Sequence, residues 1–202
     1  MKKIFLLFIF VSTVLYAEKA NLKIIFQDGL EYTESFDKGT DNITLVCKGN
    51  MRQKNIIDIR GFEQFENLTT LSMYFFQCKG DYSFFKQIKS LTNLGLIGCS
   101  AESFGFLTDL EFLEMVDLEL SFDTSTKKIK ENMDVDLRKL KNLKRITINN
   151  KMSHIPPFIN VKNKPELFLN TSDIKKINRK EYKYARQYSV IKSLNTNQNL
   201  IQ

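Results

Sequence analysis

Few residues of this chain could carry catalysis, and they do not form a recognisable site. His154 is the only histidine among 202 residues, and no neighbouring serine or cysteine completes a known nucleophile pattern around it. We therefore interpret His154 as an ordinary turn residue. The sequence contains no glycine-rich phosphate loop, H-E-x-x-H motif or calcium-binding loop. We expect no enzymatic activity, no cofactor and no metal site.

A cluster of carboxylates could suggest a pair of general acids. Its members are Asp109, Glu111, Glu114, Asp117 and Glu119. These side chains are expected to project from alternate sides of a strand and its flanking turns. A solvated surface is therefore the favoured interpretation of the cluster.

Three cysteines, Cys47, Cys78 and Cys99, lack the short C-x-x-C spacings that hold zinc. If the protein is exported to an oxidising environment, two of the cysteines could form a disulfide and the third would remain a thiol. We predict that Cys47 pairs with Cys78, because Cys99 falls at an inward position of the pattern described below.

The first seventeen residues, MKKIFLLFIFVSTVLYA, have the features of a secretory signal. Two lysines precede an apolar run from Ile4 to Leu15, and Ala17 supplies a small residue at the cleavage point. The run is too short to span a membrane, which needs about 20 residues. With no cysteine near the cleavage point, we expect a periplasmic or secreted protein that is neither transmembrane nor a lipoprotein.

Charge is distributed unevenly along the mature chain. Residues 18–126 contain ten basic and seventeen acidic residues, a net charge of −7, whereas residues 127–202 contain eighteen and six, a net charge of +12. A basic half of this kind can contact anionic lipid, a polyanion or an acidic partner. A solvated face in a lysine-rich chain is the favoured alternative. Export argues against nucleic acid as a partner.

The first part of the mature chain is expected to form strands. Asp28-Gly29 separates two runs rich in β-branched and aromatic residues, which is the strongest short signal for a hairpin. The run from Asn42 to Cys47 reads as a third strand. We therefore assign residues 18–55 to an N-terminal β cap.

From Ile56 onward, apolar residues return at every third position and then at a two-residue step. Neither a strand nor an α-helix has this period. The pattern recurs in four blocks: Ile56, Ile59, Phe62, Phe65, Leu68, Leu71, Met73, Phe76 and Cys78; Phe85, Ile88, Leu91, Leu94, Leu96, Cys99 and Ala101; Phe104, Leu107, Leu110, Leu113, Met115, Leu118 and Leu120; and Leu137, Leu140, Leu143, Ile146 and Ile148. The two-residue step indicates a short strand, and the three-residue steps indicate tight turns. Stacking such blocks would bury a continuous core.

The stretch LTNLGLIGCSA resembles the leucine-rich repeat pattern L-x-x-L-x-L-x-x-N/C-x-L. IIDIRGFEQFENLTTLSM is similar to the internalin type of bacterial repeat in particular, and the resemblance covers about residues 56–159. It implies an α/β solenoid, a short right-handed coil with an N-terminal β cap and a C-terminal helical cap. We expect repeats over 56–160, with an exposed insertion near 122–136, and the cap with a frayed tail over 161–202.

The blocks are irregular. Equivalent strand positions, taken as Leu71, Leu94, Leu113 and Ile146, are 23, 19 and 33 residues apart. HIPPFI, at 154–159, resembles the L-P-x-x-I tail of many bacterial repeats. In the last segment, PELFLN is expected to be an edge strand, and Asn178 with Glu181 suggests a helix start.

Residues that flank the inward positions are expected to point to the concave face of the sheet. They form columns across strands about 4.8 Å apart, and one column is expected to contain Tyr74, Ile97, Val116 and Asn149. The candidate partner-binding residues are Tyr74, Phe75, Ile97, Phe112, Glu114, Val116, Asp117, Arg145, Thr147 and Asn149. Five of them are proposed as apolar anchors, namely Tyr74, Phe75, Ile97, Phe112 and Val116. Alternatively, the N-terminal hairpin or the insertion covers these positions.

Two functions remain open. The first is an exported, non-enzymatic leucine-rich repeat protein that binds another protein through its short concave sheet. The second is an envelope-associated adhesive or structural protein that holds an anionic surface polymer or lipid with its basic C-terminal half, including Arg138–Arg145. Salt dependence distinguishes them, because exposed charges are screened over about 10 Å at 0.1 M salt.

Overall fold

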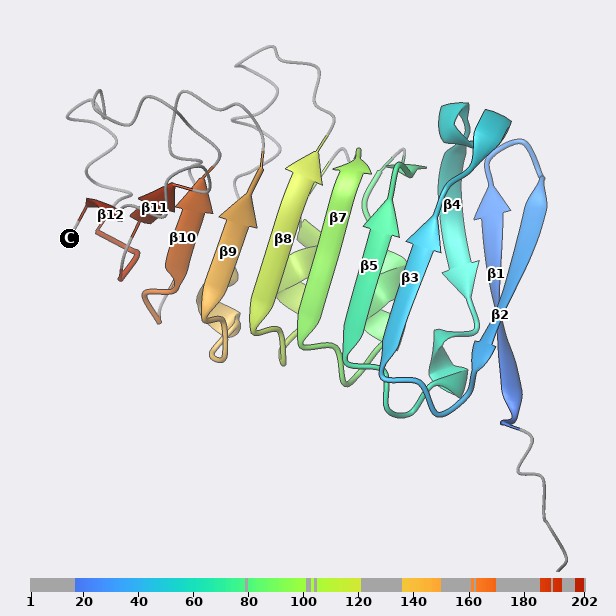
Figure 1. The fold of residues 1–202 in the computed structure, drawn as a ribbon, viewed down its shortest axis with the longest axis horizontal. Helices are drawn as coiled ribbons and strands as arrows, with labels where there is room; N and C mark the ends of the chain where they lie inside the picture. The colour runs from blue at the N-terminus through green and yellow to red at the C-terminus, as the bar shows by residue number, and fades with distance from the viewer. Residues whose placement is uncertain are drawn as a thin grey trace, which may run out of the picture.

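The regular elements of the described residues are strands and short 3-10 helices. The computed structural model describes residues 17–78, 80–100, 103, 105–120, 136–149, 161, 163–169, 186–189, 191–193 and 199–201. A large sheet has the strand order β12-β11-β10-β9-β8-β7-β5-β3, and a smaller one has the order β2-β1-β4-β6 (Figure 1). Buried residues of both sheets belong to one hydrophobic core.

The strands are β1 (Lys19–Phe26), β2 (Glu31–Asp37), β3 (Asn42–Val46), β4 (Asn55–Arg60), β5 (Thr70–Tyr74), β6 (Gln77–Cys78), β7 (Asn93–Cys99), β8 (Met115–Leu120), β9 (Arg145–Ile148), β10 (Glu166–Leu169), β11 (Ile191–Ser193) and β12 (Asn199–Ile201). The 3-10 helices are η1 (Gly49–Gln53), η2 (Phe62–Gln64), η3 (Ser83–Gln87), η4 (Gly105–Asp109) and η5 (Leu137–Lys139).

The large sheet is parallel from β3 to β11, and its register lines up one buried residue from each strand. No member of this inward row is more than 2% exposed. The row consists of Ile43, Leu71, Leu94, Val116, Ile146, Leu167 and Ile191. Because side chains alternate along a strand, the neighbouring residues form rows on the opposite face of the sheet.

Short 3-10 helices explain the three-residue period of the sequence. A 3-10 helix has three residues per turn, so residues three apart point to the same side. Each of η2, η3, η4 and η5 contains a buried apolar residue, and the apolar residue three positions later is buried as well. The pairs are Phe62 and Phe65, Phe85 and Ile88, Leu107 and Leu110, and Leu137 and Leu140. In Figure 1, η3 and η4 lie behind the large sheet, so their apolar sides close the core from that side.

An aromatic cluster fills the core between η3 and η4. The ring of Tyr82 stacks on that of Phe85 with centroids 5.3 Å apart, and Phe106 meets both rings edge-on. Tyr82 is 0% exposed, and its hydroxyl donates to the carbonyl oxygen of Ser100 at 2.7 Å. This bond satisfies a polar group that would otherwise be unpaired inside the core.

The N-terminal strands are divided between the two sheets. β1 and β2 form an antiparallel hairpin around Asp28-Gly29, and Gly29 takes the positive φ of 83° that this turn requires. β3, in contrast, pairs in parallel with β5 and is therefore the first strand of the large sheet. The expected cap of residues 18–55 thus contributes one strand to the sheet that it was expected to cover.

The expected fold class, an α/β solenoid with a C-terminal helical cap, is wrong. The structure is mostly β, and within the described ranges no helix reaches seven residues. Where the helical cap was expected, β10 and β11 continue the parallel sheet and β12 joins it antiparallel. PELFLN is likewise an internal strand of the sheet, since β10 lies between β9 and β11.

The phase of the third block also differs from expectation. Leu94 pairs with Val116, not with Leu113, so successive strand positions are 23, 22 and 30 residues apart. Leu113 instead continues the three-residue pattern of the preceding turn and is 0% exposed. The third block therefore contains one more three-residue step before its strand than we assigned.

Several expectations lie outside the described residues. They concern the secretory signal at 1–16, the insertion at 122–135, His154 with the HIPPFI tail, and the helix start at Asn178.

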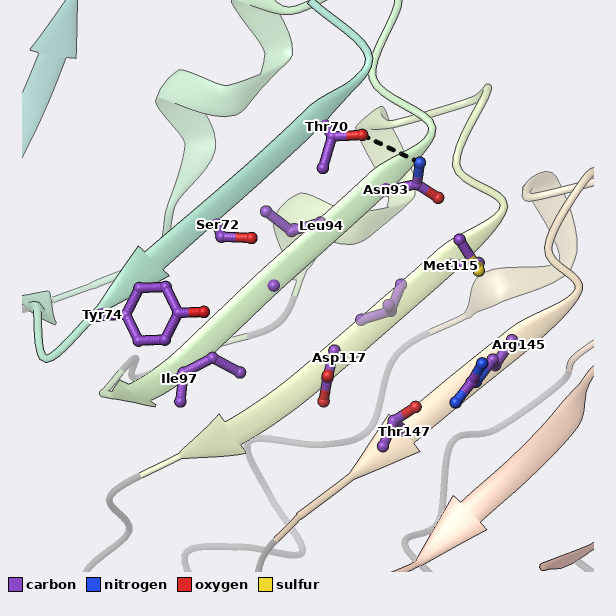
Figure 2. Close-up of a pocket in the computed structure, with 12 residues that line it drawn as sticks. Thr70, Ser72, Tyr74, Asn93, Leu94, Ile97, Met115, Asp117, Arg145 and Thr147 are labelled. Atoms are coloured by element: carbon purple, nitrogen blue, oxygen red, sulfur yellow. Dashed lines mark hydrogen bonds between the residues drawn. The ribbon is translucent and has the colours of Figure 1, made fainter. Parts of the chain in front are cut away.

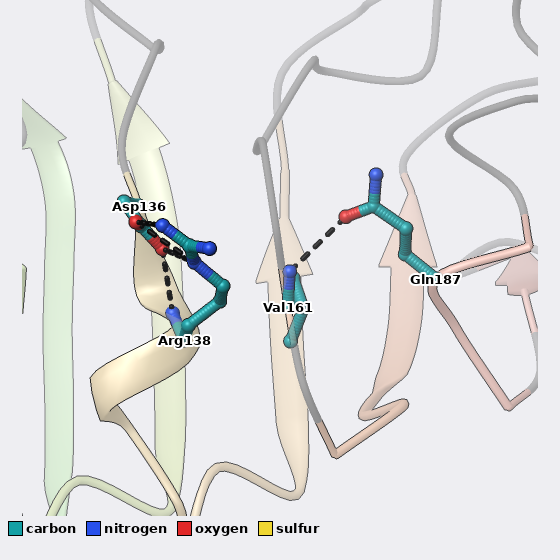
Figure 3. Close-up of polar contacts among 4 residues, drawn as sticks. All are labelled: Asp136, Arg138, Val161 and Gln187. Carbon is teal, nitrogen blue, oxygen red and sulfur yellow. Dashed lines mark hydrogen bonds and ion pairs between the residues drawn. The ribbon is translucent and has the colours of Figure 1, made fainter.

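Figure 3 shows local contacts of the described segments that contain Asp136, Val161 and Gln187. Asp136 accepts a hydrogen bond from the backbone N–H of Arg138 at 3.0 Å and pairs with its guanidinium. The side-chain oxygen of Gln187 accepts from the N–H of Val161 at 3.1 Å.

Candidate partner-binding face

The outward side of the large sheet carries three rows of residues that cross the strands. The middle row contains Thr44, Ser72, Gly95, Asp117, Thr147, Phe168 and Lys192. The row nearer the strand starts contains Asn42, Thr70, Asn93, Met115, Arg145 and Glu166. The row nearer the strand ends contains Val46, Tyr74, Ile97 and Glu119. We call these rows together the open face.

A shallow depression of about 270 Å³ lies on the open face over β5, β7, β8 and β9 (Figure 2). Gly95 lies in its middle, between Ser72 and Asp117 of the neighbouring strands. A Cβ atom added at Gly95 would lie 3.3 Å from the Ser72 hydroxyl oxygen, with no backbone atom of another strand closer. The depression therefore exists because this position carries no side chain.

Asn93 presents an unused hydrogen-bond acceptor within the depression. Its side-chain N–H donates to the hydroxyl oxygen of Thr70 at 3.1 Å, as Figure 2 shows. Its Oδ1 atom is buried and has no hydrogen-bond partner among the residues that the structure describes. A buried acceptor left unpaired costs about 1–3 kcal/mol. A ligand that turns this side-chain amide outward and brings an N–H or O–H group to Oδ1 would recover this free energy.

Opposite charges lie side by side at the other end of the depression. Partial burial raises the pKa of the Asp117 carboxyl, the nearby Arg145 guanidinium opposes this rise, and Glu119 adds to it. The Arg145 guanidinium carbon lies 4.3 Å from the centroid of the Phe168 ring. Arg145 is thus held by an aromatic ring beside a partly desolvated carboxylate. The depression offers an acceptor, a donor and apolar surface within a few strands.

Six of the candidate residues line this depression: Tyr74, Ile97, Val116, Asp117, Arg145 and Thr147. Tyr74 and Ile97 are neighbours in register and are half-buried. Thr147 is only 6% exposed. The structure therefore brings together candidates from four of the strands and places the apolar pair at one end.

Glu114 and Asn149 lie at the two margins of the open face. Glu114 directly precedes β8 and forms an ion pair with Lys144 at 2.7 Å. Asn149 directly follows β9, and its side-chain N–H donates to Glu119 at 2.7 Å. The expected column that links Tyr74 to Asn149 thus passes through Glu119.

Phe75 is packed by the protein itself. Its φ angle is 64°, and its backbone N–H donates to the carbonyl oxygen of Ile97 at 2.8 Å. The Arg52 guanidinium carbon lies 4.3 Å from the ring centroid, and a Cβ atom added at Gly98 would lie 2.6 Å from the ring. The ring is therefore in contact with both Arg52 and Gly98 and is 39% exposed. This packing leaves only part of Phe75 available to a partner.

Val116 and Phe112 do not lie on the open face. Val116 borders the depression, but it belongs to the inward row and is only 2% exposed. Phe112 lies in the turn before β8 and is 56% exposed, next to Lys86, Lys89 and Asp109 in a separate depression. Both differences follow from the register of the third block.

Because the register of the third block was predicted incorrectly, two residues of the open face, Met115 and Glu119, were not identified from the sequence. Met115 was assigned to the core, but it lines the depression and is 41% exposed. Glu119 lies beside Ile97 in the row nearer the strand ends. The sequence contains a signal for this register, because Val116 and Leu118 with Asp117 and Glu119 alternate between apolar and acidic residues.

All three cysteines are buried and none of them forms a disulfide, so the predicted pair of Cys47 with Cys78 is not formed. Burial raises the pKa of the Cys99 thiol to about 11, which keeps it protonated at neutral pH. Within the part of the chain that the structure describes, no group of His, Cys, Asp and Glu is arranged to hold a metal ion. No helix of that part is long and apolar enough to cross a membrane.

No protein-family model matches the sequence, and no curated protein matches it at a significant level. The resemblance to leucine-rich repeat proteins consequently stays a prediction.

Proposed function

We propose that this protein is an exported, non-enzymatic binding protein that holds a segment of another protein on its open face. The observation that carries the proposal is the depression around Gly95, where the buried Oδ1 of Asn93 lacks a hydrogen-bond partner within the described part of the chain. A polypeptide supplies backbone N–H groups at regular intervals, and one of them could pair with this atom. Unpaired polar atoms beside apolar contact surface are typical of binding sites rather than of finished cores.

Apolar contact would come from three residues around the depression. Tyr74 and Ile97 are half-buried neighbours at one end, and Met115 is exposed at the side. An amphipathic aromatic side chain such as tyrosine is often an anchor in protein interfaces. Asp117 and Arg145 provide charged groups of both signs, which favour a partner of mixed charge over a simple polyanion.

Export remains part of the proposal and rests on the sequence of residues 1–17. The charged start, short apolar run and small residue before Glu18 favour it.

Binding of an anionic surface polymer or lipid is the alternative that the test must separate. Three cations of the described C-terminal half are already paired with acids: Arg138 with Asp136, Lys144 with Glu114, and Lys192 with Glu166. These ion pairs reduce the positive charge that a polyanion would meet.

The test is photocrosslinking in intact cells that produce the protein naturally. A photoreactive amino acid replaces Tyr74, and a matched control carries it at Ile57, which is 54% exposed on the other sheet. We expect a protein adduct from position 74 and no equivalent adduct from position 57. Gly95→Leu should abolish the adduct by filling the depression, whereas Gly95→Ala should keep most of it.

Gly95 has no positive φ angle, so a leucine there should leave the thermal midpoint within a few degrees of the original. An adduct that persists unchanged in the folded Gly95→Leu variant would exclude the depression as the binding site. Retention on anionic vesicles that 0.5 M salt removes, without a protein adduct, would favour the alternative function.

A further inference from the structure

A second surface, at the other end of the molecule, has the properties of a strand-docking edge. β2 is the outer strand of the small sheet, and among the described strands it pairs only with β1 (Figure 1). It is seven residues long, and its register with β1 continues without a break over all seven. No other described strand pairs with β2 on its outer side.

The backbone of β2 leaves every second residue free to bond outward. Phe26 donates to the carbonyl oxygen of Leu30 at 2.9 Å, and Lys38 donates to that of Glu18 at 2.7 Å. These two bonds show that even-numbered residues of this segment face β1. In an antiparallel pair the intervening residues direct their N–H and C=O groups to the other side. The outward-directed residues are Glu31, Thr33, Ser35 and Asp37.

The side chains on the two faces of β2 differ in character. Tyr32, Glu34 and Phe36 are half-buried, and both aromatic residues pack against the core, with Phe36 edge-on to Phe65 at 6.3 Å. On the opposite face, Glu31 pairs with Lys23 at 2.8 Å, and the residues around it are exposed. An added strand would therefore extend a face that carries an aromatic residue, an acid and an aromatic residue in sequence.

Glu34 decides which kind of strand fits. Among the described residues it makes no ion pair and no side-chain hydrogen bond, whereas Glu31 and Asp37 are paired with Lys23 and Lys19. An incoming side chain opposite Glu34 lies about 5 Å away, where opposite charges attract and like charges repel. A second copy of this strand, centred on Glu34, would place one glutamate against another.

Edge strands that resist pairing usually contain a lysine, a proline or a bulge. β2 has none of these, since its sequence is EYTESFD and its pairing with β1 is regular. Only its acidic side chains oppose the pairing of β2 with another strand. They repel an acidic strand and attract a basic one. The net charge of −7 over residues 18–126 also favours a basic partner.

We propose that the outer edge of β2 binds an extended segment of a basic partner protein by adding it as a fifth strand to the small sheet. The segment has an apolar residue, a lysine or arginine two positions later, and a second apolar residue two positions after that. The apolar residues cover Tyr32 and Phe36, and the cation pairs with Glu34. Backbone bonds to Thr33 and Ser35 provide affinity that does not depend on sequence.

The test uses the synthetic peptide acetyl-Thr-Ile-Thr-Lys-Thr-Ile-Thr-amide at millimolar concentration and the full chain labelled with nitrogen-15. We expect chemical-shift changes at the amides of Thr33 and Ser35, and at least tenfold slower hydrogen exchange of both. The peptide with glutamate in place of lysine should cause neither change. Equal effects of the two peptides, or none from either, would overturn the proposal.

Thr33→Pro is the matched block, because it removes an outward N–H and leaves the bonds between β1 and β2 intact. It should abolish the peptide's effect at Ser35, while Thr33→Val should keep it. If Thr33→Pro does not fold, Glu34→Lys replaces it and should reverse the preference in favour of the glutamate peptide. An unchanged preference in folded Glu34→Lys, or undiminished binding in folded Thr33→Pro, refutes the edge as the site.

Two further readouts distinguish a basic partner at this edge from self-association and from binding at the open face. A concentration-dependent dimer that Thr33→Pro abolishes in the absence of peptide would make a second copy the occupant and overturn the basic partner. Gly95→Leu should leave the peptide's effects unchanged, because the depression around Gly95 lies on the other sheet. The edge and the open face therefore succeed or fail independently.

Discussion

Replacing Gly98 by alanine should destabilise the protein more than the same replacement at Gly29. Of the two glycines, only Gly98 has a packed side chain, the Phe75 ring, against it. Both glycines have positive φ angles, of 61° and 83°. A Cβ atom at Gly98 would lie 2.6 Å from the Phe75 ring, whereas one at Gly29 would meet no atom within 4 Å. The comparison therefore isolates the contact with Phe75.

The expected magnitudes follow from these two environments. Alanine in the left-handed region costs about 1–2 kcal/mol, which is the full expected effect of Gly29→Ala. At Gly98 the same strain is joined by displacement of a packed ring, for which overpacking typically costs a further 1–3 kcal/mol or so. Displacement would also weaken the contact of Phe75 with Arg52, worth about 0.5–1 kcal/mol. We expect a total loss of about 2–6 kcal/mol for Gly98→Ala.

The assay is urea unfolding of four proteins: the original, Gly98→Ala, Phe75→Ala and the double variant. Without the Phe75 ring the clash disappears, so the double variant should be more stable than the sum of the single effects predicts, by about 1–3 kcal/mol. Effects that add within about 0.5 kcal/mol, or equal losses for Gly98→Ala and Gly29→Ala, would refute the packing of Phe75. That outcome would return Phe75 to the set of free partner anchors.

Three other predictions concern burial and charge. Val116→Ala should lower the free energy of unfolding by about 2 kcal/mol, whereas Phe112→Ala should change it by no more than about 0.5 kcal/mol; similar losses for both would contradict the register of β8. The pKa of Asp136 is lowered to about 2, first by its hydrogen bond with the Arg138 side chain, so the stability it contributes is present above pH 3.8 and is lost as the pH falls toward 2. Asp136→Asn should therefore remove part of the acid-induced loss of stability in titrations followed by circular dichroism, and an unchanged acid profile would count against this pair. Because Cys99 and the other two cysteines are buried, a thiol reagent at pH 8 should label the native protein at least 100-fold more slowly than the urea-unfolded chain, and one fast thiol would disprove that burial.

The inward positions of the sheet could be recognised from the sequence where the spacing is regular. Leu71 and Leu94 each come three three-residue steps after a phenylalanine, Phe62 or Phe85, and the structure pairs them. Between Leu94 and the third strand, the choice of Leu113 over Val116 was wrong, because both complete a three-residue step and both are apolar. Only the hydrogen-bonded register shows which of the two lies opposite Leu94. One such step moved Val116 from the open face to the core.

The open face could be predicted only in part for the same reason. Tyr74 and Ile97 were identified because they lie next to correctly placed inward residues, while Met115 and Glu119 were missed with the third strand. The lack of a partner for Asn93 Oδ1 had no signal in the sequence, because it depends on which neighbours come within hydrogen-bonding distance. The same holds for Phe75, whose ring is packed by Arg52 and Gly98 from other segments.

By itself the sequence determined the local features of this protein: the hairpin at Asp28-Gly29, the 3-10 turns and the short strands. These follow from φ preferences and from periods of two and three residues, which act over a few neighbouring positions. Only the tertiary structure decided that β3 joins the large sheet, that β10 and β11 extend it in place of a helical cap, and that β2 is left at an open edge. Those outcomes depend on hydrogen bonds between strands far apart in the chain, and local spacing cannot specify such pairing.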